Sequence, residues 1–205
     1  EYLTKTVESI LAQDHQNFEL LLIDDGSSDN SKELIEALSE KDQRIKAFSK
    51  ANGGVANARN FGLEHSQGEF IAFCDQDDLW LPTKLSKQLP LFENTKVGLV
   101  YTGAISEYSL YGKQTKSGFK NKHRGMVFDR LVQLNMLTCC TAMARKSTLT
   151  EVGGFDETFY AAEDVQFSRD IKKWGRKRKM KFVVVKAAVV TSARKLQWHS
   201  RWHIL

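Results

Sequence analysis

The sequence predicts an α/β domain in which helices cover both faces of a mainly parallel central sheet. Helical and strand patterns alternate over residues 1–100, beginning and ending with a helix. Two of the predicted strands, 18–23 and 70–74, are mostly apolar, as strands buried on both faces are, and each runs directly into a cluster of aspartates. The one charged residue in them is Glu19. Because open α/β sheets bind ligands at the carboxyl ends of their strands, these two acidic loops indicate where a functional site would lie.

Length and composition favour one soluble domain. The 205 residues are enough for a single α/β core, and no repeat, low-complexity segment or long linker interrupts them, so we expect one domain over 1–205. Hydrophobic residues make up 41% and charged residues 27%, as in ordinary globular proteins. The longest apolar run, 182–190, is interrupted by Lys186, and no signal peptide is recognisable. The three cysteines form no disulfide framework, which favours a reducing, cytoplasmic setting.

Charge is distributed unequally along the chain. Residues 101–205 contain 20 Lys and Arg and 8 Asp and Glu, a net charge of +12, which leaves 10 basic and 17 acidic residues, a net of −7, in residues 1–100. This asymmetry predicts that the second half meets an anionic partner. The basic segment Lys172–Lys181 contains few aromatic residues and no nucleic-acid motif, so we expect no nucleic acid partner. A solvated face and a peripheral membrane contact are the two interpretations that we weigh.

The elements of the first half follow from local patterns. Apolar residues at helical spacing predict a helix over 1–13, and Asp29 or Asn30 is suited to cap the helix that contains Leu34 and Leu38. A glycine pair, Gly53-Gly54, opens a further helix. Its free N–H groups could bind an anion, although these residues alone favour a simple turn. The remaining predicted elements are strands over 18–23, 45–48 and 69–74 and a helix that begins at Pro82.

The second half is less regular. We expect a short helix over 146–152 that ends at Gly153-Gly154, and a longer helix from residue 161 to Trp174 that ends at Gly175. The other predicted elements are strands over 97–102 and 137–144, a loop or hairpin over 107–123, a helix over 126–134 and a β-rich segment over 181–190.

The acidic loop after the 70–74 strand holds Asp75, Asp77 and Asp78 within four positions. Carboxylates this close repel one another unless a cation or protons neutralise them. Mg²⁺ or Mn²⁺ would suit these oxygen ligands. A polar turn in which Asp78 caps the next helix is the alternative, and the loop by itself does not decide between the two.

Four blocks, in this order, together resemble the family-2 glycosyltransferases of the GT-A (Rossmann-like, three-layer) fold. The blocks are Phe18–Asp29, Asn52–Gly62, Glu69–Trp80 and Gly153–Asp164. The resemblance implies an inverting, hexosyltransferase-type enzyme that moves a sugar from a nucleotide diphosphate sugar, UDP-linked in the typical case, to an acceptor hydroxyl. It implies a Mn²⁺ or Mg²⁺ cofactor, a nucleotide-sugar-binding half over 1–100 and an acceptor-binding half over 101–205.

The resemblance also assigns roles on the donor side. Asp24 and Asp25 match the family's acidic pair, one of which, here Asp24, would accept a hydrogen bond from the base. Arg59 matches an arginine near the base and diphosphate. Asp75-Gln76-Asp77 matches the Asp-X-Asp metal motif, with Asp77 on the metal and Asp75 contacting the ribose or, through water, the metal. This leaves Asp78 to cap the next helix.

On the acceptor side, Asp164 matches the Asp of the family's Glu-Asp motif and would be the general base. Glu163 would orient Asp164 or the acceptor, and Gly154 would shape the acceptor loop. The implied acceptor is a saccharide or a lipid-linked saccharide of the kind used in polysaccharide or cell-envelope biosynthesis. This implies a cytoplasmic protein that can lie peripherally at the inner face of the membrane.

One departure from the family pattern affects this interpretation. Family members start with an apolar strand that lines the base pocket, and this sequence starts at the helix that follows it. We therefore expect neighbouring strand edges to be exposed. A non-catalytic or truncated nucleotide-binding relative is the alternative function that this departure supports.

Overall fold

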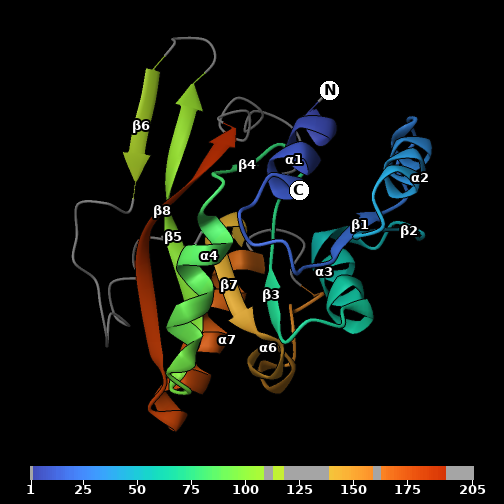
Figure 1. Ribbon diagram of the computed structural model, residues 1–205. Coiled ribbons are helices and arrows are strands. Elements are labelled where there is room, and N and C mark those ends of the chain that lie inside the picture. The colour runs from blue at the N-terminus through green and yellow to red at the C-terminus, as the bar shows by residue number, and fades with distance from the viewer. Residues whose placement is uncertain (1, 109–112, 118–138, 159–162, 193–205) are drawn as a thin grey trace.

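The computed structural model describes residues 2–108, 113–117, 139–158 and 163–192 (Figure 1). The alternation of helices and strands predicted for the first half is confirmed, and the predicted helix over 126–134 lies outside the described residues. The elements are, in order, α1 (Tyr2–Leu11), β1 (Leu20–Asp24), α2 (Ser31–Lys41), β2 (Ile45–Ser49), α3 (Gly54–His65), β3 (Phe70–Ala72), β4 (Leu79–Trp80), α4 (Lys84–Gln88), the 3₁₀ helix η1 (Leu89–Glu93), β5 (Val97–Tyr108), β6 (Lys113–Ser117), the 3₁₀ helix η2 (Cys139–Thr141), β7 (Ala142–Arg145), α6 (Lys146–Val152), α7 (Glu163–Arg178) and β8 (Lys181–Ser192).

The described strands form two sheets. β1 and β2 pair in parallel, and the larger sheet has the order β3-β7-β5-β8-β4, with β6 paired to β5. Within the larger sheet β5 and β8 are parallel and the other neighbours are antiparallel. The structure thus confirms the α/β class, but the prediction of a mainly parallel central sheet is wrong for the larger sheet, which is mainly antiparallel in its described part. Among the described residues β1 pairs only with β2 and β3 only with β7, so each leaves one edge without a strand neighbour.

Helices cover both faces of the larger sheet (Figure 1). Along β5 the side chains alternate between faces, as the strand period of two requires. Leu99 and Tyr101 join a core cluster with residues of α3, α6 and α7, whereas Val100 packs into a second cluster with residues of α1, α4 and η1. A third cluster, around β1 and β2, holds Leu22 and Ile45 together with residues of α1 and α2.

Two predicted helix boundaries are wrong. Asp78 does not cap the next helix, because β4 follows it directly and α4 begins only at Lys84, beyond Pro82. Helix α7 does not end at Gly175 but continues to Arg178. The amide of Met180 then donates to the Gly175 carbonyl, and this bond closes the last turn.

A fully buried lysine lies beneath the acidic loop. Lys84 Nζ donates to Gln88 Oε1 at 2.8 Å and lies 4.0 Å from the centre of the Trp80 ring. The Gln88 amide in turn donates to the carbonyls of Val100 and Thr141, both at 3.1 Å, which connects α4 to the sheet. Burial lowers the pKa of Lys84 to about 8, because the charged form is poorly solvated there.

We expect this lysine to make stability depend on pH. The pKa falls from 10.5 in the unfolded chain to about 8 in the folded one, so between these values only the unfolded state binds the proton. Lys84 should therefore add up to ~3 kcal/mol to the free energy of unfolding from pH 8 to 10.5. Burial raises the pKa of the Cys74 and Cys140 thiols, so these groups act in the opposite direction in the same pH range. Urea unfolding should therefore show the lysine as a difference: the stability of the parent relative to Lys84→Met should rise by up to ~3 kcal/mol across this range. The exposed Lys87→Met is the control, and equal slopes in the parent and Lys84→Met would contradict the assignment.

Candidate active site

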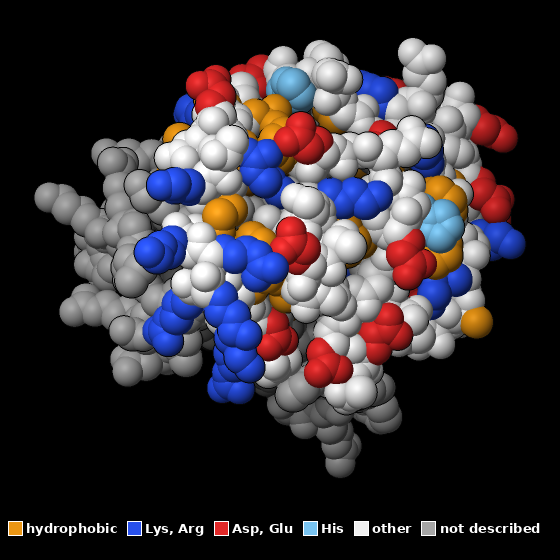
Figure 2. Space-filling model, turned by 90° about the horizontal axis from the view of Figure 1, so that it is seen from below, with side chains coloured by type: hydrophobic (Ala, Val, Ile, Leu, Met, Phe, Trp, Pro, Cys, Tyr) orange, Lys and Arg blue, Asp and Glu red, His pale blue; other side chains and the backbone are white. Residues whose placement is uncertain are grey.

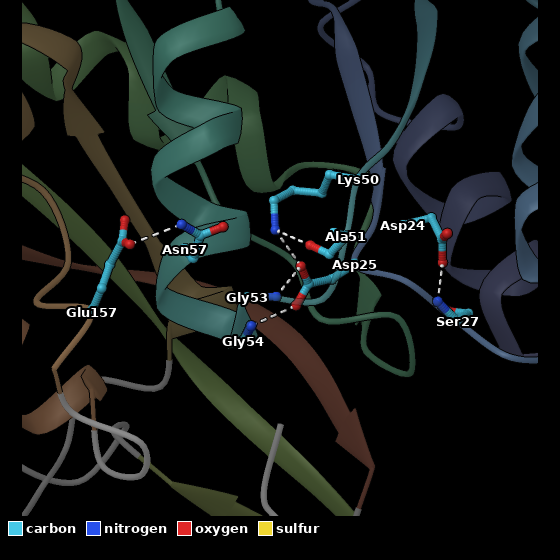
Figure 3. A network of polar contacts seen from close by, with 9 residues as sticks. All are labelled: Asp24, Asp25, Ser27, Lys50, Ala51, Gly53, Gly54, Asn57 and Glu157. Carbon is cyan, nitrogen blue, oxygen red and sulfur yellow. Dashed lines mark hydrogen bonds and ion pairs between the residues drawn. The ribbon is translucent and has the colours of Figure 1, made fainter.

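The first acidic loop leaves the carboxyl end of β1. Asp24 is buried, and its Oδ1 accepts the N–H of Ser27 at 3.1 Å, which holds the loop in a turn (Figure 3). Gly26 has a φ of +76°, and a Cβ there would come within 2.8 Å of the Asn52 amide nitrogen. The loop therefore requires glycine at this position, and it lies directly against the segment that precedes α3.

The Asp25 carboxylate binds the N-terminus of α3 (Figure 3). Its Oδ1 accepts the Gly53 N–H at 3.0 Å and the Lys50 ammonium at 2.5 Å, and its Oδ2 accepts the Gly54 N–H at 2.8 Å. These are the N–H groups that the glycine pair offers to an anion, and here the anion is the protein's own carboxylate. A negative charge at this end of a helix is stabilised by the helix dipole.

Arg59, in the middle of α3, connects two further motifs. Its Nη2 donates to Asp75 Oδ1 at 3.1 Å, and its guanidinium carbon lies 5.3 Å from the centre of the Phe155 ring. The Arg59 and Asp75 side chains are 12% and 17% exposed, so water screens this pair only in part. Helix α3 belongs to one of the four sequence blocks, and the structure thus places the other three blocks around it.

The second acidic loop separates its three carboxylates. Asp75 and Asp77 are partly exposed, whereas Asp78 is 1% exposed and lies beside Cys140. Burial and the neighbouring Asp78 charge raise the pKa of the Cys140 thiol well above its usual value. Asp75 and Asp77 therefore face the surface, and Asp78 points into the core.

Helix α1 holds this loop from the other side. Thr6 Oγ1 donates to the Gln76 carbonyl at 2.9 Å, and Ser9 Oγ accepts the Trp80 N–H at 3.1 Å. Each bond joins residues that are far apart in the sequence, 70 positions in the first and 71 in the second, so nothing in the local pattern of the loop predicts them. The Asp75–Asp77 segment is thus fixed between α1 and Arg59 of α3.

The two partly exposed carboxylates suit a hard divalent cation. Mg²⁺ sites commonly use one or two protein carboxylates and fill the other positions with substrate phosphates and water. Asp75 and Asp77 supply that number, and in the described part of the chain no cluster of three or more His, Cys, Asp or Glu residues could hold a metal by itself. The donor set therefore fits an ion that is completed by a bound diphosphate.

The loop after α6 packs on α3 through Asn60. Gly153 and Gly154 have φ values of +92° and +72°, and a Cβ on Gly154 would lie 2.5 Å from Asn60 Oδ1. Asn60 Oδ1 accepts the Phe155 N–H, and its Nδ2 donates to the Phe155 carbonyl, both at 2.8 Å. Glu157 accepts hydrogen bonds from Asn57 and Asn60.

Asn57, Asn60 and Glu157 were not among the residues that the sequence patterns singled out. Asn57 and Asn60 stand three apart on one helix, a spacing that puts them on the same face, and this was the signal in the sequence. The predicted acceptor residues Glu163 and Asp164 open α7, which agrees with the expected helix start near them. Their roles stay predictions.

The two sheets, the acidic loops that follow β1 and β3 and the helix starts beside them together define a class of protein, the GT-A-fold glycosyltransferases. S. aureus TarS 1-349, solved in complex with UDP-GlcNAc, shares the fold with a TM-score of 0.75 and 23% sequence identity, over 94% of this chain and 55% of that one. The family model "Glycosyl transferase family 2" matches residues 1–153, and the chain belongs to that family.

Two curated relatives show how much of a longer protein this domain represents. An uncharacterized glycosyltransferase of Rickettsia felis is 38% identical over 162 residues, which are 78% of this chain and 26% of that protein. The UDP-Glc:alpha-D-GlcNAc-diphosphoundecaprenol beta-1,3-glucosyltransferase WfgD of Escherichia coli is 36% identical over 114 residues, 54% of this chain and 44% of WfgD. The chain thus spans less than half the length of either relative.

We expect Asp25→Ala to destabilise the fold by about 1–2 kcal/mol, because it leaves two N–H groups of the α3 start without their acceptor. Urea unfolding of parent and variant measures the difference. Gln76→Ala, at an exposed position, serves as the control and should lie within about 0.5 kcal/mol of the parent. An Asp25→Ala variant as stable as Gln76→Ala would mean that the carboxylate does not support α3.

Proposed function

We propose that this chain is the donor-binding and catalytic domain of an inverting glycosyltransferase, with a UDP-sugar as donor and a hydroxyl group as acceptor. The observation that carries the proposal is the convergence on α3: Asp25 binds its N-terminus, and Arg59 joins Asp75 to Phe155. Family membership supports the same reaction class.

On the donor side, Asp24 would accept a hydrogen bond from the base, beside Asp25 in the same loop. Arg59 would bind the diphosphate close to Asp75, where its positive charge balances the phosphates. Asp77, with Asp75, would hold Mn²⁺ or Mg²⁺. Such an ion, when bound, stabilises the charge that develops on the departing diphosphate. The protein's own part is to keep the two carboxylates and the guanidinium at the same edge of the sheet.

On the acceptor side, Asp164 would take the proton from the attacking hydroxyl. General-base catalysis of this kind contributes on the order of 10²- to 10⁴-fold. The start of α7 is a favourable place for a carboxylate that must stay ionised, because the helix dipole stabilises its charge. Glu163 would orient the acceptor or Asp164, and Gly154 would shape the loop that the acceptor meets.

Names of relatives and neighbours support the choice of substrates. TarS was solved with UDP-GlcNAc, and the name of WfgD gives UDP-Glc as its donor and a diphosphoundecaprenol-linked sugar as its acceptor. We extend these chemistries to the present chain as a UDP-linked donor and a saccharide or lipid-linked acceptor. A non-catalytic nucleotide-binding protein is the second candidate, because β1 and β3 each leave one edge without a strand neighbour among the described residues.

Asp77→Ala and Asp164→Ala should separate the two candidates. We expect Asp77→Ala to lose the part of UDP-dependent thermal stabilisation that requires Mn²⁺. Asp164→Ala should keep that stabilisation and lose at least about 10²-fold in transfer or donor hydrolysis. Gln76→Ala is the matched control in the same loop. Unchanged turnover in both aspartate variants would refute the site, and UDP stabilisation without any turnover in the parent would favour the non-catalytic alternative.

The end of α7 offers a surface for an anionic membrane. None of the helices in the described ranges has both the length and the apolarity needed to cross a bilayer. Figure 2 shows Lys and Arg side chains gathered on the face seen from below, and Figure 1 shows α7 ending on that side of the molecule. We define the basic end of α7 by its exposed residues Lys173, Arg176, Lys177, Arg178 and Lys179.

Lys179 stands where the helix favours glycine. Its φ is +53°, and its N–H donates to the Arg176 carbonyl at 3.3 Å, next to the bond from Met180 to Gly175. This is the pattern in which glycine usually ends a helix, and another residue in the left-handed region costs roughly 1–2 kcal/mol. We propose that this lysine serves a peripheral contact of a cytoplasmic protein with the inner face of the membrane.

Lys179→Gly should therefore act on stability and membrane binding in opposite directions. We expect a higher free energy of unfolding and about five-fold weaker sedimentation with phosphatidylserine-containing vesicles, since each basic residue contributes about 1 kcal/mol near an anionic surface. Lys177→Glu should weaken binding further, and neither variant should matter with phosphatidylcholine vesicles. Lys32→Gly, on α2, controls for the loss of a lysine as such. Unchanged binding in both basic-end variants would rule the surface out.

A further inference from the structure

The face of α3 turned toward the loop after α6 carries two asparagines. Asn57 and Asn60 lie one turn apart on this helix and both meet Glu157, about a hundred residues further along the chain (Figure 3 shows the Asn57 bond). Asn57 Nδ2 donates to Glu157 Oε2 at 2.8 Å, and Asn60 Nδ2 donates to Glu157 Oε1 at 2.7 Å. We call Asn57, Asn60 and Glu157 the amide cluster. Its two hydrogen bonds lower the pKa of the Glu157 carboxyl, so the cluster is formed by the ionised carboxylate.

The Asn60 side chain both accepts a hydrogen bond from the loop backbone and donates one to it. Its amide accepts from the Phe155 N–H and donates to the Phe155 carbonyl, as a neighbouring strand would. The preceding Gly154 has a left-handed φ and no room for a Cβ, since that atom would lie 2.5 Å from Asn60 Oδ1. The loop can therefore approach this amide only with glycine at position 154.

Burial alone does not explain the cluster. Phe155 is 2% exposed and packs against Phe73 and Phe167, so the hydrophobic core already holds the loop on the domain. Glu157 is exposed, where single hydrogen bonds add little to stability because water competes for both partners. Directional bonds at such a place fix orientation, and here they fix the backbone of Phe155 beneath Arg59.

Two sides of the proposed site meet at this point. Arg59 lies over the ring of Phe155, which belongs to the proposed acceptor loop. It also pairs with Asp75, which belongs to the proposed donor loop. Phe155 stacks on Phe167 of α7 with ring centres 4.3 Å apart, so the loop contacts the helix whose first turn contains Asp164. We infer that Asn57, Asn60 and Glu157 are positioning residues that set the place of the acceptor loop, and with it the start of α7, relative to the bound donor. This inference rests on the proposed function.

A reciprocal exchange of side chains tests the inference. Asn57→Asp places two carboxylates face to face and should lower kcat by roughly 10- to 100-fold, the cost of a small misplacement of reacting groups, with the donor KM within about two-fold of the parent. In the double variant Asn57→Asp/Glu157→Gln, the new glutamine can accept from Asn60 and donate to the new aspartate. The double variant should therefore recover most of the lost kcat. A role in stability alone would not separate kcat from KM in this way.

A second measurement follows the loop without using catalysis. Asn60→Ala removes the acceptor of the Phe155 N–H, so hydrogen exchange at this amide should become faster than in the parent, while exchange within β5 stays unchanged. Faster exchange at Phe155 together with a parental kcat in Asn60→Ala would overturn the positioning role. A double variant no more active than Asn57→Asp would do the same. Absence of any transfer by the parent protein would instead overturn the proposed function, and the positioning role with it.

Discussion

The site depends on the bond between the Asp25 carboxylate and the N-terminus of α3. Without a partner, the Gly53 and Gly54 N–H groups would face the surface as unsatisfied donors at the positive end of the helix dipole. Asp25 fills that position, ties the end of β1 to the start of α3 and also binds Lys50 at the end of β2. Ala56 and Leu63 hold the other face of α3 in the core, so the contact with Asp25 and the core packing together orient the helix.

Two of those residues, Arg59 and Asn60, face different parts of the site. Arg59 joins the acidic loop after β3 to the Phe155 ring, and Asn60 binds the backbone of Phe155. Adjacent helix positions point about 100° apart, so one turn of helix can hold two loops that are 80 residues apart in sequence. Gly154 lets the Phe155 loop come close enough to bond with Asn60, and Gly26 lets the loop after β1 approach the segment before α3.

Patterns along the sequence predict the parts of this arrangement that local chemistry determines. The apolar strands, the acidic loops at their ends and the glycine-led start of α3 all follow from short segments. The sequence predicts a helix cap at Asp78 because the pairing of Leu79 with Val190 in β8 spans 111 positions and leaves no trace in the loop itself. It predicts a helix end at Gly175, yet this glycine is buried within α7, where packing offsets the roughly 1 kcal/mol that glycine costs. Asn57, Asn60 and Glu157 are ordinary surface residues until the fold brings them together.

Helix α1 explains how the acidic loop stays in place although the β1–β2 sheet and the larger sheet share no strand pairing in the described residues. Val7 packs in the core cluster around β1 and β2. Ile10, one turn later, packs with Trp80 in the core cluster on one face of the larger sheet. Between them α1 binds the Gln76 carbonyl and the Trp80 N–H through hydroxyl groups. The Asp75–Asp77 segment is therefore held by α1 on one side and by Arg59 on the other. The loop at Phe155 reaches α3 through partly buried polar bonds next to its own buried ring, so one helix holds both this loop and the acidic loop in place.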